Sequence, residues 1–153
     1  MRIETDFTTV GHLLGPDCSI EATLELVGDR WALLVLRDVF RGVHRFSDMC
    51  ADLGIARNIL AERLERLVAA GILTKVPYQE RPLRHEYRLT PKGRDLSPAL
   101  IALMRWGDRW AMAGDAPTLL VHDACGTELE QVLRCPTCDV PVTPTHIRSR
   151  HPA

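Results

Sequence analysis

The stretch IARNILAERLERLVAAGILTKVPYQERPLRHEYRLT, residues 55–90, decides the fold. Its first half predicts an arginine-rich amphipathic helix, with apolar residues at helical spacing and Gly71 as its end. The apolar stripe consists of Leu60, Leu64, Leu67 and Val68. Two β-type runs follow, ILTKVPY and HEYRLT, joined by the basic segment QERPLR. A helix followed by a basic hairpin is typical of a winged helix-turn-helix, so we predict a mainly α fold with a small β-hairpin wing.

Three further helices are predicted upstream, each after a side chain that can cap a helix. The caps are Ser19 before residues 20–27, Asp29 before residues 30–40, and Ser47 before a brief helix that ends at Leu53. The second helix, RWALLVLRDVF, is apolar almost all round, so we expect it to be the buried central helix. Gly54 closes a tight turn before the helix of residues 55–71, which completes a helix-turn-helix.

A long helix is predicted after the hairpin, from Pro91 to about Ala113, with Pro98 either kinking it or marking its true start. One small winged domain cannot cover the broad apolar stripe of this helix, which would otherwise form a large exposed patch. The stripe consists of Leu96, Leu100, Leu103, Trp106, Gly107 and Trp110. We therefore expect a homodimer that buries the Leu96–Ala113 helix and the helix after Cys18 against a second copy.

The net charge of −1 hides an uneven distribution. Residues 30–94 contain 13 Lys or Arg and 7 Asp or Glu, whereas acidic residues gather outside this range. A basic middle is what a surface that binds nucleic-acid phosphates requires. Solvated helix faces would give the same count, so charge alone leaves both interpretations open.

The length of 153 residues suits one main domain and a small appendage. We predict an N-terminal arm (1–17), a winged-helix DNA-binding and dimerisation domain (18–114), a ribbon-like segment (115–143) and a tail (144–153). The N-terminus has no apolar region like that of a signal peptide, and no run is long enough for a membrane helix. We therefore expect a cytoplasmic protein with no membrane partner and with its five cysteines reduced.

The sequence resembles the HxlR family of bacterial winged-helix transcriptional regulators, which are related to the MarR group. The resemblance covers roughly residues 18–112 in unbroken order, and membership would imply a homodimer, palindromic operators and a role as repressor or activator. It rests on Cys18, VGDRW at 27–31, RFSDM at 45–49, Leu60-x-x-Arg63-Leu64, AGIL at 70–73, EYRLT at 86–90 and Trp106-Gly107. Two positions depart from the pattern, since the usual Gly-Lys-Trp reads Gly-Asp-Arg-Trp and the usual Cys-Pro reads Cys18-Ser19.

Candidate base contacts lie near the start of the predicted recognition helix. Arg57 can bind guanine and Asn58 adenine through paired hydrogen bonds, and Ala61 is small enough to let the helix approach the bases. Arg63 would contact phosphate or pair with a neighbouring glutamate. The alternative is an ordinary arginine-rich surface helix, but the basic hairpin that follows favours double-stranded DNA as the partner.

The predicted wing supplies further cations. Arg81, Arg84 and His85 surround Pro82-Leu83 at the tip of the hairpin, which suits contact with a minor groove or with flanking phosphates. Arg45, just before the brief third helix, is another candidate for phosphate contact.

The C-terminal segment contains two pairs of metal-binding side chains. His122-x2-Cys125-Gly and Cys135-Pro-Thr-Cys138 resemble the two knuckles of a zinc ribbon, and one His with three Cys would form a closed tetrahedral structural zinc site. We therefore predict a short β zinc-ribbon-like appendage with zinc as its cofactor. A metal-free ribbon packed by its apolar residues, or a Cys135–Cys138 disulfide, are the alternatives.

Cys18 and Cys50 lie outside these pairs. Some HxlR relatives sense oxidants through a cysteine at the position of Cys18, so a redox role and a packing role both stay open for it. Cys50 is expected to be a small apolar residue of the third helix. No nucleophile, base and oxyanion arrangement and no phosphate loop is present, so an enzyme is not expected. A docking module for other proteins is the remaining alternative to a regulator that responds to a small molecule or redox signal.

Overall fold

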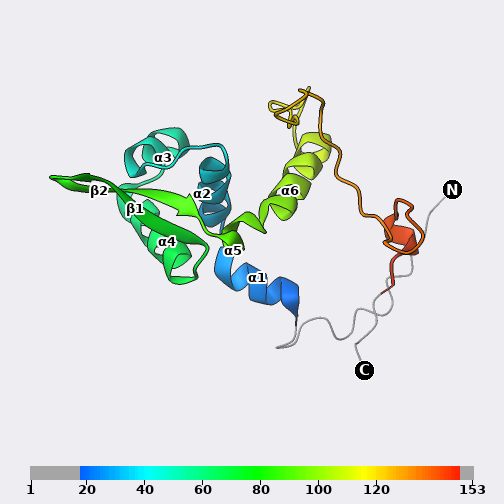
Figure 1. Cartoon of the computed structure of the whole chain (residues 1–153), viewed down its shortest axis with the longest axis horizontal. Helices are drawn as coiled ribbons and strands as arrows, with labels where there is room; N and C mark the ends of the chain where they lie inside the picture. The colour runs from blue at the N-terminus through cyan, green and yellow to red at the C-terminus, as the bar shows by residue number, and fades with distance from the viewer. Residues whose placement is uncertain (1–17, 149–153) are drawn as a thin grey trace. The chain divides into compact units, whose positions relative to one another are not determined.

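The computed structural model describes residues 18–148, and contacts divide them after Ser97 into two compact units. The predicted arm (1–17) and the last residues of the predicted tail (149–153) lie outside the described residues. The elements are α1 (Ser19–Val27), α2 (Arg30–Phe40), α3 (Phe46–Leu53), α4 (Arg57–Ala69), β1 (Leu73–Glu80), β2 (Leu83–Leu89), α5 (Pro91–Arg94), α6 (Ser97–Trp110) and η1 (Pro144–His146) (Figure 1).

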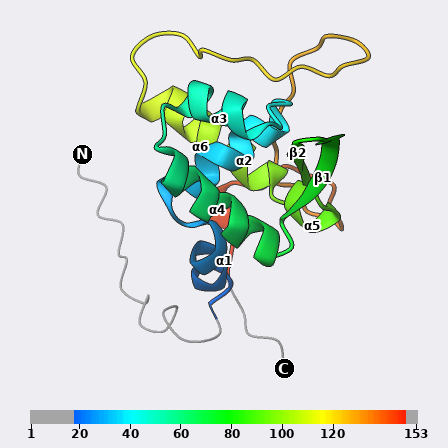
Figure 2. The ribbon, with the colours of Figure 1, turned by 90° about the vertical axis from the view of Figure 1, so that its left-hand side faces the viewer.

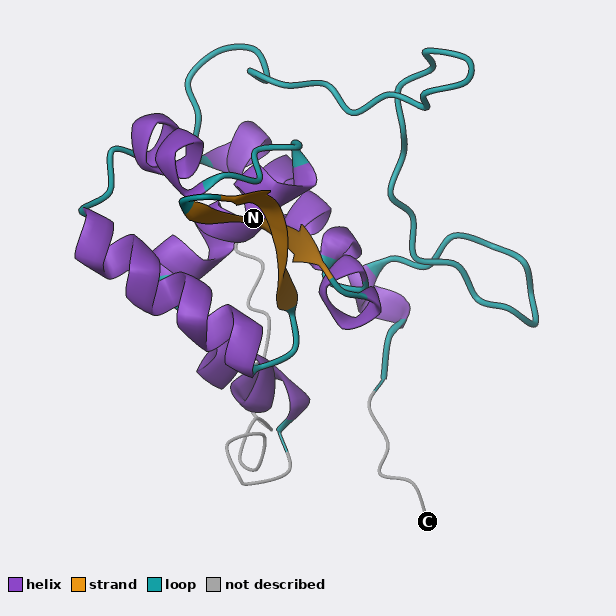
Figure 3. Ribbon diagram, turned by 60° about the vertical axis from the view of Figure 1, so that its left-hand side comes forward, coloured by secondary structure: helices purple, strands orange, loops and turns teal. Residues whose placement is uncertain are grey.

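The first unit is a bundle of short helices with one β-hairpin, as predicted (Figure 3). The strands β1 and β2 pair antiparallel from Leu73↔Leu89 to Glu80↔Leu83. They are longer than the sequence indicated, because most of the joining segment QERPLR is itself paired and only residues 81–82 form the turn. The register shifts between Pro77 and Gln79, which leaves Tyr78 as an extra, unpaired residue of β1.

The core of the first unit is built around α2, as its apolar composition predicts. Val35 and Leu36 of α2 are fully buried, and so are Leu60 and Leu64 of α4. Met49 is the residue that α3 contributes to this core, and it is also fully buried. The predicted helical stripe of α4 is therefore the surface through which this helix packs on α2, which leaves the opposite surface of α4 open.

A charged cluster joins α2 to α3. The carboxylate of Asp38 is fully buried, and Arg37 donates to its Oδ1 at 2.6 Å while also reaching Asp52 Oδ2 of α3 at 2.9 Å. Arg41 approaches the same Asp52 oxygen at 3.4 Å. Burial raises the pKa of Asp38, and the hydrogen bond from Arg37 partly offsets that effect. Both arginines are thus neutralised by the fold itself.

The predicted helix caps are correct in one case out of three. Asp29 caps α2, since its Oδ1 accepts from the N–H groups of Trp31 at 3.0 Å and Ala32 at 3.1 Å. Ser19 and Ser47 do not cap; the residues at the cap positions are Cys18 and Arg45, and neither makes a side-chain cap bond. The shift at α3 has a physical cause, because Arg45 is held extended by a bridge to β2 and the helix begins directly after it.

The long helix predicted after the hairpin is two helices. Thr90 caps the short α5 by accepting from the N–H of Gly93 at 3.1 Å, and α6 begins at Ser97. Pro98 therefore marks the true start of the long helix, which was one of the two predicted alternatives, because proline fits the first turn of a helix but not its interior.

The second unit begins with α6 and runs on through a segment of turns that ends in η1 (Figure 3). Arg105 of α6 donates to the carbonyl of Leu129, and Gln131 donates to the carbonyl of Pro98 at 2.7 Å. These bonds connect α6 to the C-terminal segment within the second unit, which begins at Pro98. Within residues 18–148, no helix is long and apolar enough to cross a lipid bilayer.

Candidate nucleic-acid interface

The turn between α3 and α4 presents the start of α4 to solvent. Gly54 ends α3 with a φ of 59°, a left-handed conformation that glycine adopts without strain, and Ile55 is buried behind the turn. Ala56 precedes α4 and provides no side-chain cap, so the first N–H groups of the helix stay available to an anion. This terminus is suited to a phosphate group.

The predicted base-contacting residues lie on this exposed first turn. Arg57 and Asn58 are exposed, and Ala61 is half-buried one turn further along α4. The guanidinium of Arg57 stacks over the ring of Phe46 with its carbon 5.1 Å from the ring centre. This cation–π contact reduces the freedom of a long side chain before any partner is bound.

The other end of α4 is fixed to the base of the wing. The N–H of Ile72 donates to the carbonyl of Leu67 at 2.9 Å, and the hydroxyl of Thr90 donates to the carbonyl of Gly71 at 2.6 Å. Lys92 adds a bond from Nζ to the carbonyl of Ala70 at 2.8 Å. Figure 2 faces this part of the molecule, with α4 in front, α3 above it and the β1–β2 hairpin to its right. The helix α4 and the hairpin are therefore joined into one continuous surface.

The wing carries cations at its tip. Arg81 and Arg84 are exposed, and His85 is half-exposed. Among the described residues, neither arginine takes part in an ion pair. The Arg57 guanidinium is equally free of carboxylates in this part of the chain. The cations that the fold leaves without a carboxylate partner thus include those at the helix start and the wing tip.

Arg45 makes contacts within the fold in addition to the phosphate contact that the sequence predicts for it. Its Nε donates to Glu86 Oε1 of β2 at 3.2 Å, and its guanidinium carbon lies 4.4 Å from the centre of the Tyr78 ring. The backbone continues this joint, because the N–H of Tyr87 donates to the carbonyl of His44 at 2.8 Å. Arg45 therefore joins α3 to the wing, although half of its side chain stays exposed for a phosphate contact.

Glu86 is the negative centre of this joint. Its other oxygen, Oε2, accepts from Arg88 Nη2 at 2.5 Å. The hydrogen bonds from Arg88 and then from Arg45 hold the pKa of the Glu86 carboxyl below its ordinary value. Sequence reasoning missed both Glu86 and Tyr78. Alternation along β2 places Glu86 on one face with Arg84 and Arg88, and this pattern could have predicted the ion pairs of Glu86. The register shift that leaves Tyr78 unpaired has no signal in the sequence.

Arg63 points inward and follows the salt-bridge alternative. Its Nε donates to Asp29 Oδ1 at 2.9 Å and its Nη1 to Glu62 at 2.7 Å, and only 19% of its side chain is exposed. The hydrogen bond that Arg63 donates to Asp29 raises the pKa of Arg63. Since the same Asp29 oxygen caps α2, this contact locks the recognition helix onto the start of the central helix.

Cys18 and Cys50, which lie outside the predicted ligand pairs, are both half-buried. Cys18 is half-buried at the N-terminal cap position of α1, and its carbonyl accepts from the N–H of Ala22. Cys50 is half-buried in α3. Neither is paired within the described residues.

The four predicted metal ligands form two local pairs. His122 Nδ1 lies 3.2 Å from Cys125 Sγ, and hydrogen bonds to Thr127 and to His122 lower the pKa of the Cys125 thiol. Backbone N–H groups of Cys138 and Thr137 lower the pKa of Cys135. Within residues 18–148, no three His, Cys, Asp or Glu side chains are gathered as they would be around a metal ion. The pairs are thus formed separately.

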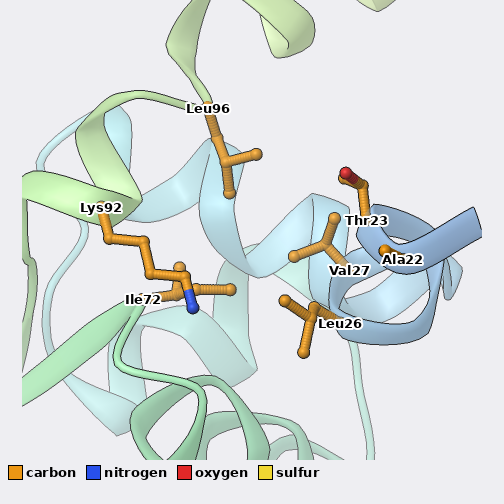
Figure 4. Close-up of a pocket in the computed structure, with 7 residues that line it drawn as sticks. All are labelled: Ala22, Thr23, Leu26, Val27, Ile72, Lys92 and Leu96. Atoms are coloured by element: carbon orange, nitrogen blue, oxygen red, sulfur yellow. The ribbon is translucent and has the colours of Figure 1, made fainter. Parts of the chain in front are cut away.

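A shallow pocket of about 220 Å³ lies in the first unit, where α1 meets the start of β1 and the end of α5 (Figure 4). It is lined mostly by apolar side chains, and its one charged residue, Lys92, already donates to the carbonyl of Ala70. The lining residues are Ala22, Thr23, Leu26, Val27, Ile72, Lys92 and Leu96. The pocket is smaller than the usual range of about 300–1,000 Å³ for small-molecule sites.

Comparison with known proteins gives consistent matches over this surface. A model described as HxlR-like helix-turn-helix matches residues 26–115. An uncharacterized HTH-type transcriptional regulator of Mycobacterium tuberculosis is 44% identical over 130 residues, which cover 84% of this chain and 82% of the relative. A regulator of the same description from Synechocystis is 37% identical, over 65% of this chain and 72% of its own length.

Solved structures agree with the sequence matches. A crystal structure described as that of a transcription factor, PA1607, superposes with a TM-score of 0.81 at 34% identity, over 92% of this chain and 99% of its own. The redox regulator HypR in its oxidized form gives a TM-score of 0.56 at 30% identity, over 60% of this chain and 96% of its own. These proteins are named as regulators and not as enzymes, in agreement with the expectation from the sequence.

Proposed function

Because this chain belongs to the HxlR-like helix-turn-helix family of transcriptional regulators, we propose that it binds double-stranded DNA sequence-specifically, as a homodimer on a palindromic operator. One observation carries the proposal. Arg57 and Asn58 are exposed on the uncapped first turn of α4, and that helix is fixed to a wing whose Arg81 and Arg84 pair with no carboxylate among the described residues. A regulator of this kind would act in the cytoplasm.

The roles of these residues follow from their chemistry. The start of α4 would enter the major groove, where Arg57 and Asn58 read base edges and Ala61 lets the helix approach closely. Arg81 and Arg84 would neutralise phosphates beside that groove, with His85 near them and Arg45 at the joint between α3 and the wing. Arg63 supports this surface from behind through Asp29.

The proposed dimer would cover two apolar helix faces. α6 has no buried residue, and Trp106 and Trp110 are 64% and 65% exposed. On α1 only Val27 is buried, while Ile20 and Leu24 are exposed. A second copy is the natural cover, and a two-fold arrangement would set the two recognition helices about 34 Å apart, one turn of DNA. A monomeric mass in sedimentation at micromolar concentration would contradict this.

The signal that controls binding would act at Cys18 or through a small molecule. Cys18 lies at the start of α1, within the proposed dimer surface, so oxidation there would alter the spacing of the two recognition helices. In the pocket beside α1 the two polar side chains, Lys92 and Thr23, already donate to backbone carbonyls, those of Ala70 and Ser19. We therefore favour redox control. Loss of oxidant sensitivity in Cys18→Ser, measured as operator affinity with and without peroxide, would support it, and unchanged sensitivity would refute it.

The class of function is tested by salt. Binding to bulk DNA must weaken as the salt concentration rises. Each contact between a cationic side chain and a phosphate releases counterions from the DNA, and this release becomes less favourable at high salt. Arg84→Ala should flatten the slope of log affinity against log salt by up to about 0.9. Arg41→Ala removes the same charge from a cation already engaged with Asp38 and Asp52, and should leave the slope unchanged. Absence of binding at low salt would instead favour a protein-docking module.

A further inference from the structure

The segment after α6 has a regular structure that no buried core explains. Within residues 111–148 no residue is buried, and Leu119, Leu129, Leu133 and Val140 are among its exposed apolar side chains. The segment nevertheless forms two tight hairpins with defined backbone hydrogen bonds. A short segment without a core needs another source of stability, such as a disulfide or a metal ion.

The two hairpins are the same structure repeated thirteen residues apart. In the first, the N–H of His122 donates to the carbonyl of Thr127 at 2.8 Å and the N–H of Gly126 donates back to His122 at 2.7 Å. In the second, Cys135 donates to Val140 at 3.0 Å and Asp139 donates back to Cys135 at 2.9 Å. Each candidate ligand of the first hairpin thus has an equivalent in the second.

The strands that frame the two turns repeat in the same way. Val121 pairs with Glu128 across the first turn, and Arg134 pairs with Pro141 across the second. The bond from Leu129 to the carbonyl of Leu120 recurs as the bond from Val142 to Leu133, both at 2.8 Å. The repetition therefore covers the whole of each hairpin and not only its tip.

The residue after each second ligand has the same unusual backbone. Gly126 has a φ of 68°, and Asp139, which is not a glycine, has a φ of 53°. An L-residue is rarely held in the left-handed region, and here Arg134 Nη1 contacts Asp139 Oδ1 at 2.9 Å. Such a turn lets the two ligand side chains of each hairpin converge, as the 3.2 Å contact between His122 and Cys125 illustrates.

The side chains at the two turns offer nitrogen and sulfur donors. His122 Nδ1 lies 3.2 Å from Cys125 Sγ, and the hydroxyl of Thr127 lies 3.3 Å from the same sulfur. Carboxylates take no part in either pair, so the donor set is nitrogen and sulfur only, which matches Zn²⁺ and not Mg²⁺ or Ca²⁺.

From the repeated hairpins we propose that His122, Cys125, Cys135 and Cys138 together bind one zinc ion per chain, in a closed structural site that draws the two hairpins together. The described structure holds the pairs apart, so the ion would supply the link between them. Four protein ligands leave no open position for a substrate, and the site is therefore not catalytic.

The test is the metal content of the full-length protein purified without chelator. We expect about one equivalent of zinc by elemental analysis. Replacement by Co²⁺ should give the intense visible bands of a tetrahedral ion and a sulfur-to-cobalt charge-transfer band. Zinc far below one equivalent, with Cys125, Cys135 and Cys138 all freely titratable, would overturn the proposal. So would a Cys135–Cys138 disulfide in protein prepared under reducing conditions.

Matched variants separate this site from chance binding. Cys138→Ser and His122→Ala should each lower zinc retention at least tenfold, whereas Cys50→Ser and His146→Ala should leave it unchanged, since these residues lie outside both pairs. The helical circular dichroism of each variant reports whether the first unit still folds. Equal zinc retention in Cys138→Ser and Cys50→Ser would contradict the site.

Discussion

The first unit and the segment after α6 reach order by different means. In the first unit, α2 and α4 bury Val35, Leu36, Leu60 and Leu64 completely, and the hairpin is tied to that core. In the segment of residues 111–148, no residue is buried although the backbone forms two equivalent hairpins. Hydrophobic burial therefore positions the recognition helix. The C-terminal hairpins depend instead on local hydrogen bonds and on the link between the two hairpins.

The largest expected effect comes from breaking the core behind the recognition helix. Leu64→Ala should lower the free energy of unfolding by about 2–5 kcal/mol, because it removes a fully buried side chain and leaves a cavity. Leu133→Ala, in an exposed position of the second unit, should change it by no more than about 0.5 kcal/mol. Urea unfolding followed by circular dichroism measures both. Similar losses for the two variants would mean that the segments are not stabilised differently.

A smaller effect is expected at the cap of α2. Asp29→Ala removes the cap of that helix and the partner of Arg63, and should lower the unfolding free energy by about 1–2 kcal/mol. Ser19→Ala should change it by less than about 0.5 kcal/mol, because Ser19 makes no cap bond. Thermal unfolding of the two variants distinguishes these outcomes. An equal loss of unfolding free energy in Ser19→Ala would mean that Ser19 does cap α1.

The smallest effect is the titration of the wing joint. The pKa of Glu86 is lowered in the folded protein, so its contacts stabilise the fold above the pKa of an unfolded glutamate and are lost as pH falls through the folded pKa. Arg88→Ala should raise the pKa of Glu86 more than Arg45→Ala does, since Arg88 has the larger effect. Carboxyl chemical shifts followed by NMR measure this. If the pKa of Glu86 in the parent protein is at or above that of a free glutamate, the proposed contacts of Glu86 with Arg45 and Arg88 are contradicted.

The same comparison explains what the sequence could predict. The stripe of Leu60, Leu64 and Leu67 is a periodic pattern, and periodic burial is what a helix in a core requires, so the buried face of α4 could be predicted from it. Arg57 and Asn58 could be placed because a helix start is marked by local sequence. The pairing of Arg45 with Glu86 could not, because it joins residues 41 positions apart and depends on how the hairpin packs.

Local signals also failed where backbone pairing competes with them. Ser47 looks like a cap, but the bridge from Arg45 to β2 starts α3 two residues earlier, with Arg45 at the cap position, and leaves the Ser47 hydroxyl to donate to Asp48 at 2.9 Å. In the C-terminal segment the spacing of His122, Cys125, Cys135 and Cys138 predicted two knuckles, and both turns are present. The repeat of their hydrogen bonds was not visible in the sequence, because their side chains differ at most positions.

The central claim is that the start of α4 reads DNA bases, and one measurement tests it most directly. Operator sequences would be selected from a random DNA pool, and dissociation constants measured for the parent, Arg57→Ala and Arg66→Ala on the selected operator and on a scrambled duplex. Arg66 is a matched control on the same helix, since it lies far from the first turn of α4 and its Nη2 donates to the carbonyl of Glu25 of α1 at 3.5 Å. We predict that Arg57→Ala weakens operator binding by about 1–3 kcal/mol, with little change on scrambled DNA and none for Arg66→Ala on either. Equal weakening of Arg57→Ala on both duplexes, or no weakening on the operator, would contradict the claim.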